Sequence, residues 1–184
     1  PVFLTPSEDF LSEVEEELAA SVAMGKIEIQ DIDAGENGTI TVEILEITCE
    51  RNGEESVVDE PFRIREGQGQ IGNTLTVQLE STDDFDFTYA YGLYSIKFRA
   101  TDNGEESKSI EKIYKIKIND INNNYPVMDD TYDDESFSLI SGAGVGPIEI
   151  ADGSPLPLFN ATDDDEPDNP NSILVYQIQE SSEP

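Results

Sequence analysis

Apolar and polar residues alternate along much of the first two thirds of the chain. Ile27 and Ile29, for example, flank Glu28. Comparable alternations recur at 40–44, 62–64, 75–79, 94–100 and 114–118. A period of two is typical of β-strands with one buried face. The last two runs are long and flank a glycine-containing loop, which predicts a β-hairpin.

The spacing of these runs predicts an all-β fold. About seven strands fit into the stretch before residue 119, as in the sandwiches of immunoglobulin-like domains. No helical crossovers separate the strands, which excludes a parallel sheet. We therefore expect a seven-stranded Greek-key sandwich of the immunoglobulin-like type. The alternation shifts parity after Ile44, which predicts a β-bulge there, and the polar stretch 50–61 predicts a loop.

The start of the chain leaves two interpretations open. Residues 1–18 begin with an extended Pro-Val-Phe entry and continue through Phe10 and Val14. A short helix over 13–23 is the competing interpretation, because glutamate, leucine and alanine favour helices. A strand is preferred because the opening of the chain is echoed further on.

A linker at 119–126 divides the chain. It reads NDINNNYP, and Asn and Asp residues this dense before a proline cannot extend a strand or a helix. The PVM that starts at its proline echoes the PVF that opens the chain, at a period of one small domain. We expect one repeat at 1–124 and the N-terminal half of a second, truncated repeat at 125–184. The opening proline, without a methionine, indicates an excised fragment.

Composition narrows the class of partner. The chain has 41 acidic and 10 basic residues, a formal charge of −31. This charge excludes nucleic-acid phosphates as partners and favours cations. A solvated acidic surface is the alternative, although the acids stand in short clusters between the apolar alternations. The sequence contains no run of about 20 apolar residues and so itself shows no membrane span. The single Cys49 cannot form an internal disulfide.

Three segments resemble the signature motifs of cadherin repeats. Residues 31–38, 100–104 and 120–126 read DIDAGENG, ATDNG and DINNNYP. They are similar, in order and spacing, to the family motifs DxDxGxNG, AxDxG and DxNDNxP. The resemblance covers essentially the whole chain. It implies a calcium-binding extracellular module of a cell-adhesion or cell-surface receptor protein.

The resemblance also implies calcium ligands at both ends of the first repeat. Two carboxylates spaced by one residue in a glycine-bounded loop can converge on one hard cation. The ligands expected at the end that would face a preceding repeat are Asp31, Asp33, Asn37 and Asp102. Those expected at the junction of the two repeats are Glu16, Asp84, Asp86, Asp120, Ile121, Asn122, Asn123, Asn124, Asp163, Asp165 and Asn169. Ordinary solvated acidic turns are the alternative for Glu16 and for the Asp84–Asp86 segment.

The sequence departs from the family pattern at three places. Asp86 stands where the family's DxE motif has a glutamate, and Asn123 stands where the linker motif has an aspartate. The second repeat has no glutamate that corresponds to Glu16. Because the Asn123 amide contributes no charge, we expect calcium, which accepts six to eight oxygens, to bind this junction more weakly than one with the family's ligands. The missing glutamate of the second repeat would weaken only the next junction. The resemblance implies that up to three calcium ions bind between the two repeats and stiffen their junction.

The sequence bears on three classes of function. The first is the cadherin-like ectodomain, with other cadherin-like ectodomains and the neighbouring repeats of the same chain as partners, and with a membrane span outside this fragment. The second is an acidic secreted matrix or mineral-associated protein that binds calcium through bulk charge. The third, an enzyme, is not expected, because the chain has no histidine and no nucleophile motif. Two glycosylation sequons, at Asn37 and Asn160, are compatible with an extracellular, cell-surface glycoprotein.

Overall fold

The structure is a computed structural model, and it divides into two compact units, Pro1–Ile121 and Asn122–Pro184. It describes residues 1–65, 69–83, 85–87, 90–128, 139–140, 149–150, 161–165 and 170–175. The repeats predicted at 1–124 and 125–184 differ from these units by the three linker residues 122–124 and stay a prediction.

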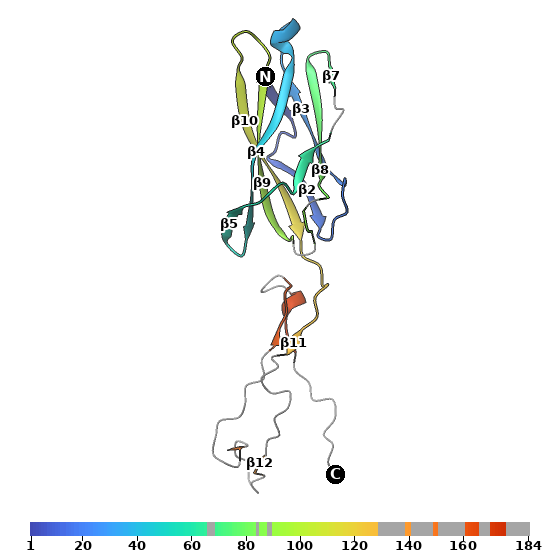
Figure 1. The fold of residues 1–184 in the computed structure, drawn as a ribbon, viewed down its shortest axis with the longest axis vertical. Helices are drawn as coiled ribbons and strands as arrows, with labels where there is room; N and C mark the ends of the chain where they lie inside the picture. The colour runs from blue at the N-terminus through green and yellow to red at the C-terminus, as the bar shows by residue number, and fades with distance from the viewer. Residues whose placement is uncertain are drawn as a thin grey trace. The chain divides into compact units, whose positions relative to one another are not determined.

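Two β-sheets face each other in the first unit (Figure 1). The first sheet contains, in order, β1 (Val2–Thr5), β3 (Ala23–Gln30), β8 (Thr74–Ser81) and β6 (Phe62–Ile64), and β7 (Gln70–Ile71) also pairs with β8. The second sheet contains, in order, β2 (Phe10–Glu15), β10 (Ser109–Asn119), β9 (Gly92–Asp102), β4 (Ile40–Arg51) and β5 (Glu54–Val57). The predicted all-β sandwich is confirmed.

One strand pair departs from the antiparallel pattern. β2 and β10 run parallel, with Lys117 opposite Glu13 and Ile118 opposite Val14, whereas the other pairs in the first unit are antiparallel. The reason is that the chain leaves the first sheet after β1 and joins the edge of the second sheet as β2. Neither sheet of the first unit is a parallel sheet, as predicted, but the parallel pair of β2 and β10 was not predicted.

The inward faces of both sheets form one hydrophobic core. Every second residue of β3, β8, β9 and the end of β10 points inward, as the alternation predicts. The largest fully buried side chains are Tyr94, Tyr114, Phe62, Phe98, Met24, Ile27, Ile29, Leu79, Ile96, Ile116, Ile118 and Val77. Removing each such side chain from water contributes about 1.5–3 kcal/mol.

Three local predictions concern the N-terminal stretch, the parity shift after Ile44 and the polar stretch 50–61. The N-terminal stretch forms the strands β1 and β2, so the helical alternative for 13–23 is wrong. The predicted bulge is confirmed, because the register of β4 with β9 shifts between Ile44 and Glu46. The loop predicted at 50–61 is wrong in part, since β4 and β5 form a hairpin there. Its turn is Asn52-Gly53, with φ of 53° and 78°, a left-handed conformation that these two residue types tolerate.

The second unit contains two short strand pairs. β11 (Val127–Met128) pairs with β14 (Ala161–Thr162), and β12 (Leu139–Ile140) pairs with β13 (Glu149–Ile150). A 3-10 helix, η3, spans Pro170–Ser172. Between residues 142 and 157, the structure describes only the two residues of β13. Across the described parts of both units, no helix is long and apolar enough to cross a membrane.

Candidate metal-binding loops

The loop that follows β3 carries the first pair of predicted ligands. Asp31 is 6% exposed, and the Asp33 backbone amide donates a 2.9 Å hydrogen bond to Asp31 Oδ1. The amino-terminal nitrogen of Pro1 lies 2.7 Å from Asp31 Oδ2. The hydrogen bond from this amine, followed by that from the Asp33 amide, lowers the pKa of the Asp31 carboxyl below its ordinary value. Asp31 is therefore an ionised carboxylate.

Asn37 and Asp102 come together around the backbone of Gly104. Asn37 lies in the 3-10 helix η1 (Gly35–Gly38), and Asp102 ends β9. A Cβ on Gly104 would lie 2.9 Å from Asn37 Oδ1 and 3.2 Å from Asp102 Oδ1, so both oxygens crowd this position. The backbone amides of Gly104 and Lys108 donate to Asp102 Oδ1 at 3.0 and 3.1 Å. Glycine suits this position because a side chain would displace the two oxygens.

Gln70 supports the same loop, and no motif of the sequence predicted this role. Its Nε2 donates to the backbone carbonyl of Gly38 at 2.6 Å, and its Oε1 accepts from the backbone amide of Ile40 at 2.8 Å. Gln70 thus extends from β7 in the first sheet to the start of β4 in the second. Its partners are backbone atoms, which any sequence supplies, so no residue pattern could have marked this contact.

Glu16 lies at the other end of the first unit, just after β2. Its carboxylate is buried, at 5% exposed. Oε2 accepts from the backbone amides of Ala90 and Tyr91 at 3.0 and 3.2 Å, and Oε1 accepts from that of Ile121 at 3.2 Å. Burial, together with the nearby carboxylate of Asp120, raises the pKa of the Glu16 carboxyl against the lowering effect of these hydrogen bonds. Ionised Glu16 is therefore held at a place where a positive charge would stabilise it.

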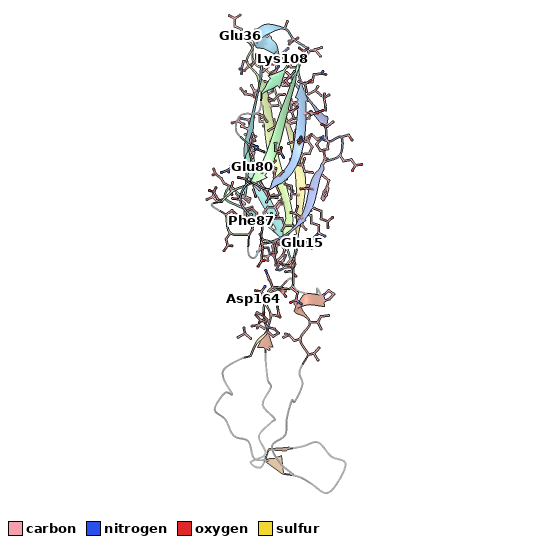
Figure 2. All side chains as sticks on the ribbon, turned by 90° about the vertical axis from the view of Figure 1, so that its right-hand side faces the viewer. Glu15, Glu36, Glu80, Phe87, Lys108 and Asp164 are labelled. Atoms are coloured by element: carbon pink, nitrogen blue, oxygen red, sulfur yellow. The ribbon has the colours of Figure 1, made fainter. Side chains whose placement is uncertain are left out.

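The structure brings Glu16, Asp120 and Ile121 together, and it describes the DxE-like segment only in part. Asp84 lies outside the described residues, and Asp86 is exposed. The segment nevertheless passes this end of the sandwich, because the Glu17 backbone amide donates to the Phe87 carbonyl at 2.8 Å. Figure 2 shows Phe87 and Glu15 at this end, and Glu36 and Lys108 at the opposite end of the first unit.

In the second unit, the linker and the loop after β14 share hydrogen bonds. Asn124 donates to Asp165 Oδ1 through its backbone amide at 3.2 Å and its Nδ2 at 2.6 Å. Nδ2 also donates to Asn123 Oδ1 at 2.9 Å. The Asp165 backbone amide donates to Asp163 Oδ1 at 3.1 Å. These four predicted ligands therefore come together, whereas Asn169 lies outside the described residues and Asn122 is exposed.

These loops fit calcium by their chemistry. Asp165 is 1% exposed, and within the described residues its Oδ2 is buried without a hydrogen-bond partner, a costly state for a carboxylate oxygen that no cation neutralises. The donors are carboxylate, amide and backbone oxygens, which calcium prefers and softer metals do not. No three Asp, Glu, Cys or His side chains form a group that could hold a metal among the described residues. A calcium site here therefore needs the amide and backbone oxygens as well.

Comparison with known proteins places the chain in a family. No family model matches it. Human protocadherin beta-1 is 30% identical over 128 residues, which cover 70% of this chain and 14% of that protein. Human protocadherin-1 is 24% identical over 178 residues, 96% of this chain and 14% of the relative. The chain belongs to the cadherin family. It spans about a seventh of the length of these two curated relatives.

Solved structures agree with the cadherin fold. Extracellular cadherin domains 3–6 of protocadherin gamma B2 match with a TM-score of 0.55 and 21% identity, over 89% of this chain and 31% of that one. The protocadherin gammaB4 extracellular domain matches with a TM-score of 0.56 and 20% identity, over 93% and 22%. At this identity the likeness establishes the fold alone. Membership of the cadherin family, whose members are not enzymes, confirms the prediction that the chain is not an enzyme.

Proposed function

We propose that this cadherin chain is a calcium-binding part of a cell-adhesion or cell-surface receptor ectodomain, in which calcium stiffens the junction between tandem repeats. The observation that carries the proposal is the pair of buried carboxylates Glu16 and Asp165, one in each unit. Neither makes an ion pair with a Lys or Arg side chain among the described residues. Buried carboxylates without a cationic partner destabilise a fold, unless a bound cation compensates.

The residues of each unit would prepare their own half of the junction. In the first unit, the amides of Ala90, Tyr91 and Ile121 orient both oxygens of Glu16. In the second unit, Asn124 orients one oxygen of Asp165 and leaves Oδ2 available. Calcium, when bound, would supply the positive charge and the six to eight oxygen bonds that draw such groups together.

The loop at the other end of the first unit is proposed as half of a second junction. Asp31 and Asp33 are linked by a backbone-to-carboxylate hydrogen bond, and Asn37 and Asp102 meet at Gly104. The four residues offer carboxylate and amide oxygens to calcium held against a neighbouring repeat. Anchorage at the plasma membrane and engagement of other cadherin-like ectodomains belong to the same proposal and rest on family membership.

Calorimetric titration of calcium into the 184-residue protein tests the proposal, with magnesium as the control. Dedicated sites should saturate at a fixed stoichiometry, with dissociation constants of about 10⁻⁴ to 10⁻³ M, as in other extracellular modules. Magnesium should bind far more weakly, because it requires a tighter octahedron. Small-angle scattering should show reduced motion between the units once calcium is bound. Weak, non-saturating binding with equal effects of both ions would instead favour an acidic matrix protein that binds calcium through bulk charge.

A further inference from the structure

β6 forms one edge of the first sheet and is hydrogen-bonded along one side. Its partner is β8, and among the described residues no other strand pairs with it. The Arg65 backbone amide donates to the Gln78 carbonyl at 2.9 Å, and the Pro61 carbonyl accepts from the Thr82 amide at 3.1 Å. The backbone groups that face β8 therefore belong to every second position, namely 61, 63 and 65.

Phe62 and Ile64 direct their backbone groups to the other side. Successive residues of a strand point their N–H and C=O groups in opposite directions, so those of Phe62 and Ile64 face away from β8. Such an unpaired row is a template for a further strand, and natural proteins often protect it with a charged residue. Arg63 is such a residue, but its charge is already matched, because its Nε lies 3.0 Å from Glu80 and its Nη1 3.2 Å from Asp83. The edge is therefore open to a short extended segment.

A groove of about 470 Å³ lies between β6, β4 and the segment that joins β5 to β6. Its floor is apolar, since Ile47 is 5% and Phe62 2% exposed, and Ile44, Val58 and Ile64 also line it. The Val58 backbone amide donates to the Ile47 carbonyl at 3.0 Å and so holds the joining segment against β4. Pockets for ligands span about 300–1,000 Å³, so the groove has room for aliphatic side chains.

The rim of the groove is acidic. Glu46, Asp59 and Glu60 line it and are exposed. Among the described residues, none of the three forms an ion pair. Arg63 is the one basic residue of the lining, and its charge is matched. A partner that complements this groove therefore combines aliphatic side chains with positive charge.

The other edge strands lack such a floor. β5, an edge of the second sheet, is exposed at all four of its residues. β1, the opposite edge of the first sheet, is exposed at three of its four residues. A strand added at either place would bury few apolar side chains. β6 therefore differs by having an open backbone row next to an apolar groove.

We propose that β6 binds an extended segment of another protein, which adds a strand to the first sheet. In an antiparallel addition, two residues of this segment exchange backbone hydrogen bonds with Phe62 and Ile64. Residues directly opposite each other point to the same side of a sheet, so these two enter the groove and should be aliphatic. Lys or Arg residues on both sides of them then face Asp59, Glu60 and the rest of the rim. The inference goes beyond the calcium-dependent junction and does not depend on it.

A synthetic peptide of the sequence Lys-Lys-Ile-Thr-Ile-Lys-Lys tests the proposal against the 184-residue protein in saturating calcium. Fluorescence anisotropy of the labelled peptide should show saturable one-to-one binding at protein concentrations up to about 1 mM. The same peptide with both isoleucine nitrogens methylated keeps its side chains and charge but loses the two donors that face β6. It should bind at least about tenfold more weakly.

Hydrogen exchange locates the added strand. Binding of the unmodified peptide should slow exchange at the backbone amides of Phe62 and Ile64, which face the open edge. The amide of Arg65 is already bonded to β8 and should change little by comparison. Occupation of the groove by side chains without an added strand would leave the first two amides unprotected.

Charge variants of the protein test the rim. Asp59→Asn combined with Glu60→Gln should weaken binding of the lysine-flanked peptide about fivefold or more. The matched control is Glu105→Gln combined with Glu106→Gln, which removes the same charge from the exposed loop between β9 and β10. This control should bind within about twofold of the unaltered protein, since screened charges far from the groove contribute little.

Four results would overturn the proposal. They are no saturable binding of the peptide, equal binding of its methylated form, unprotected amides at Phe62 and Ile64, and equal effects of the two double variants. None of these results bears on calcium binding, so the proposed function would stand if strand addition failed.

Discussion

The Ile121 backbone amide donates a hydrogen bond of 3.2 Å to Glu16 Oε1, although the two residues are 105 positions apart. The contact joins the end of β2 to the chain just after β10. With the amides of Ala90 and Tyr91, it fixes a buried carboxylate at the end of the sandwich from which the linker departs. A buried carboxylate that is held by backbone amides, and that has no basic partner among the described residues, is well prepared to bind a cation.

Substitution of Glu16 tests this assignment. Glu16→Gln should weaken calcium binding about tenfold or more, because affinity in oxygen cages depends on the number of charged ligands. The matched control is Glu15→Gln, since Glu15 is an exposed neighbour with the same charge. Calorimetry on both variants measures the effect. Equal affinities for the two variants would show that calcium responds to the total charge and not to Glu16.

Asn123 stands where the family's linker motif has an aspartate, and its substitution should have the opposite effect. Asn123→Asp adds a charged ligand, so calcium should bind more tightly and motion between the units should decrease. Asn52→Asp, in the remote turn between β4 and β5, makes the same change in net charge and is the control. Calorimetry and small-angle scattering across a calcium titration report the two quantities. If Asn123→Asp binds no more tightly than the control, Asn123 does not contact calcium.

The sequence predicted the sandwich well because hydrophobic alternation directly reflects which face of a strand is buried. The shift of parity after Ile44 even located the bulge in β4. Hydrophobic alternation did not reveal β5, within 50–61, because this strand is exposed along its whole length. The motifs predicted the candidate calcium ligands, but they did not predict the hydrogen-bonding groups that hold these ligands in place. Gln70 and the amides that bind Glu16 act through backbone atoms, which leave no trace in a residue pattern.

Cys49 should behave as a core residue. It is 4% exposed, and burial raises the pKa of its thiol, against the effect of its contacts with Tyr94 and Arg51. The thiolate is the reactive form, so alkylation of the native protein should be slower than that of the urea-unfolded protein, by on the order of 10³-fold or more. Mass spectrometry after timed exposure to an alkylating reagent measures both rates. Similar rates in the two states would contradict burial of this side chain.

Gln70 should control the stability of the loop that carries Asp31, Asp33 and Asn37. Its Nε2 donates to the carbonyl of Gly38 at 2.6 Å, so Gln70→Glu replaces a donor by a carboxylate oxygen that faces a carbonyl. At neutral pH this variant should lower the free energy of unfolding by about 1–3 kcal/mol, the usual cost of an unsatisfied polar group.

The folded state disfavours the ionised form, so the pKa of the new carboxyl is raised on folding. Stability relative to the unaltered protein should therefore be best preserved below the ordinary glutamate pKa of about 4.3 and be lost as the pH rises above it. Urea unfolding at neutral pH and below about pH 4.3 measures this effect, with Gln78→Glu on the outer face of β8 as the control. If the difference in the free energy of unfolding between the two variants does not change with pH, the contact of residue 70 with the Gly38 carbonyl is not its cause.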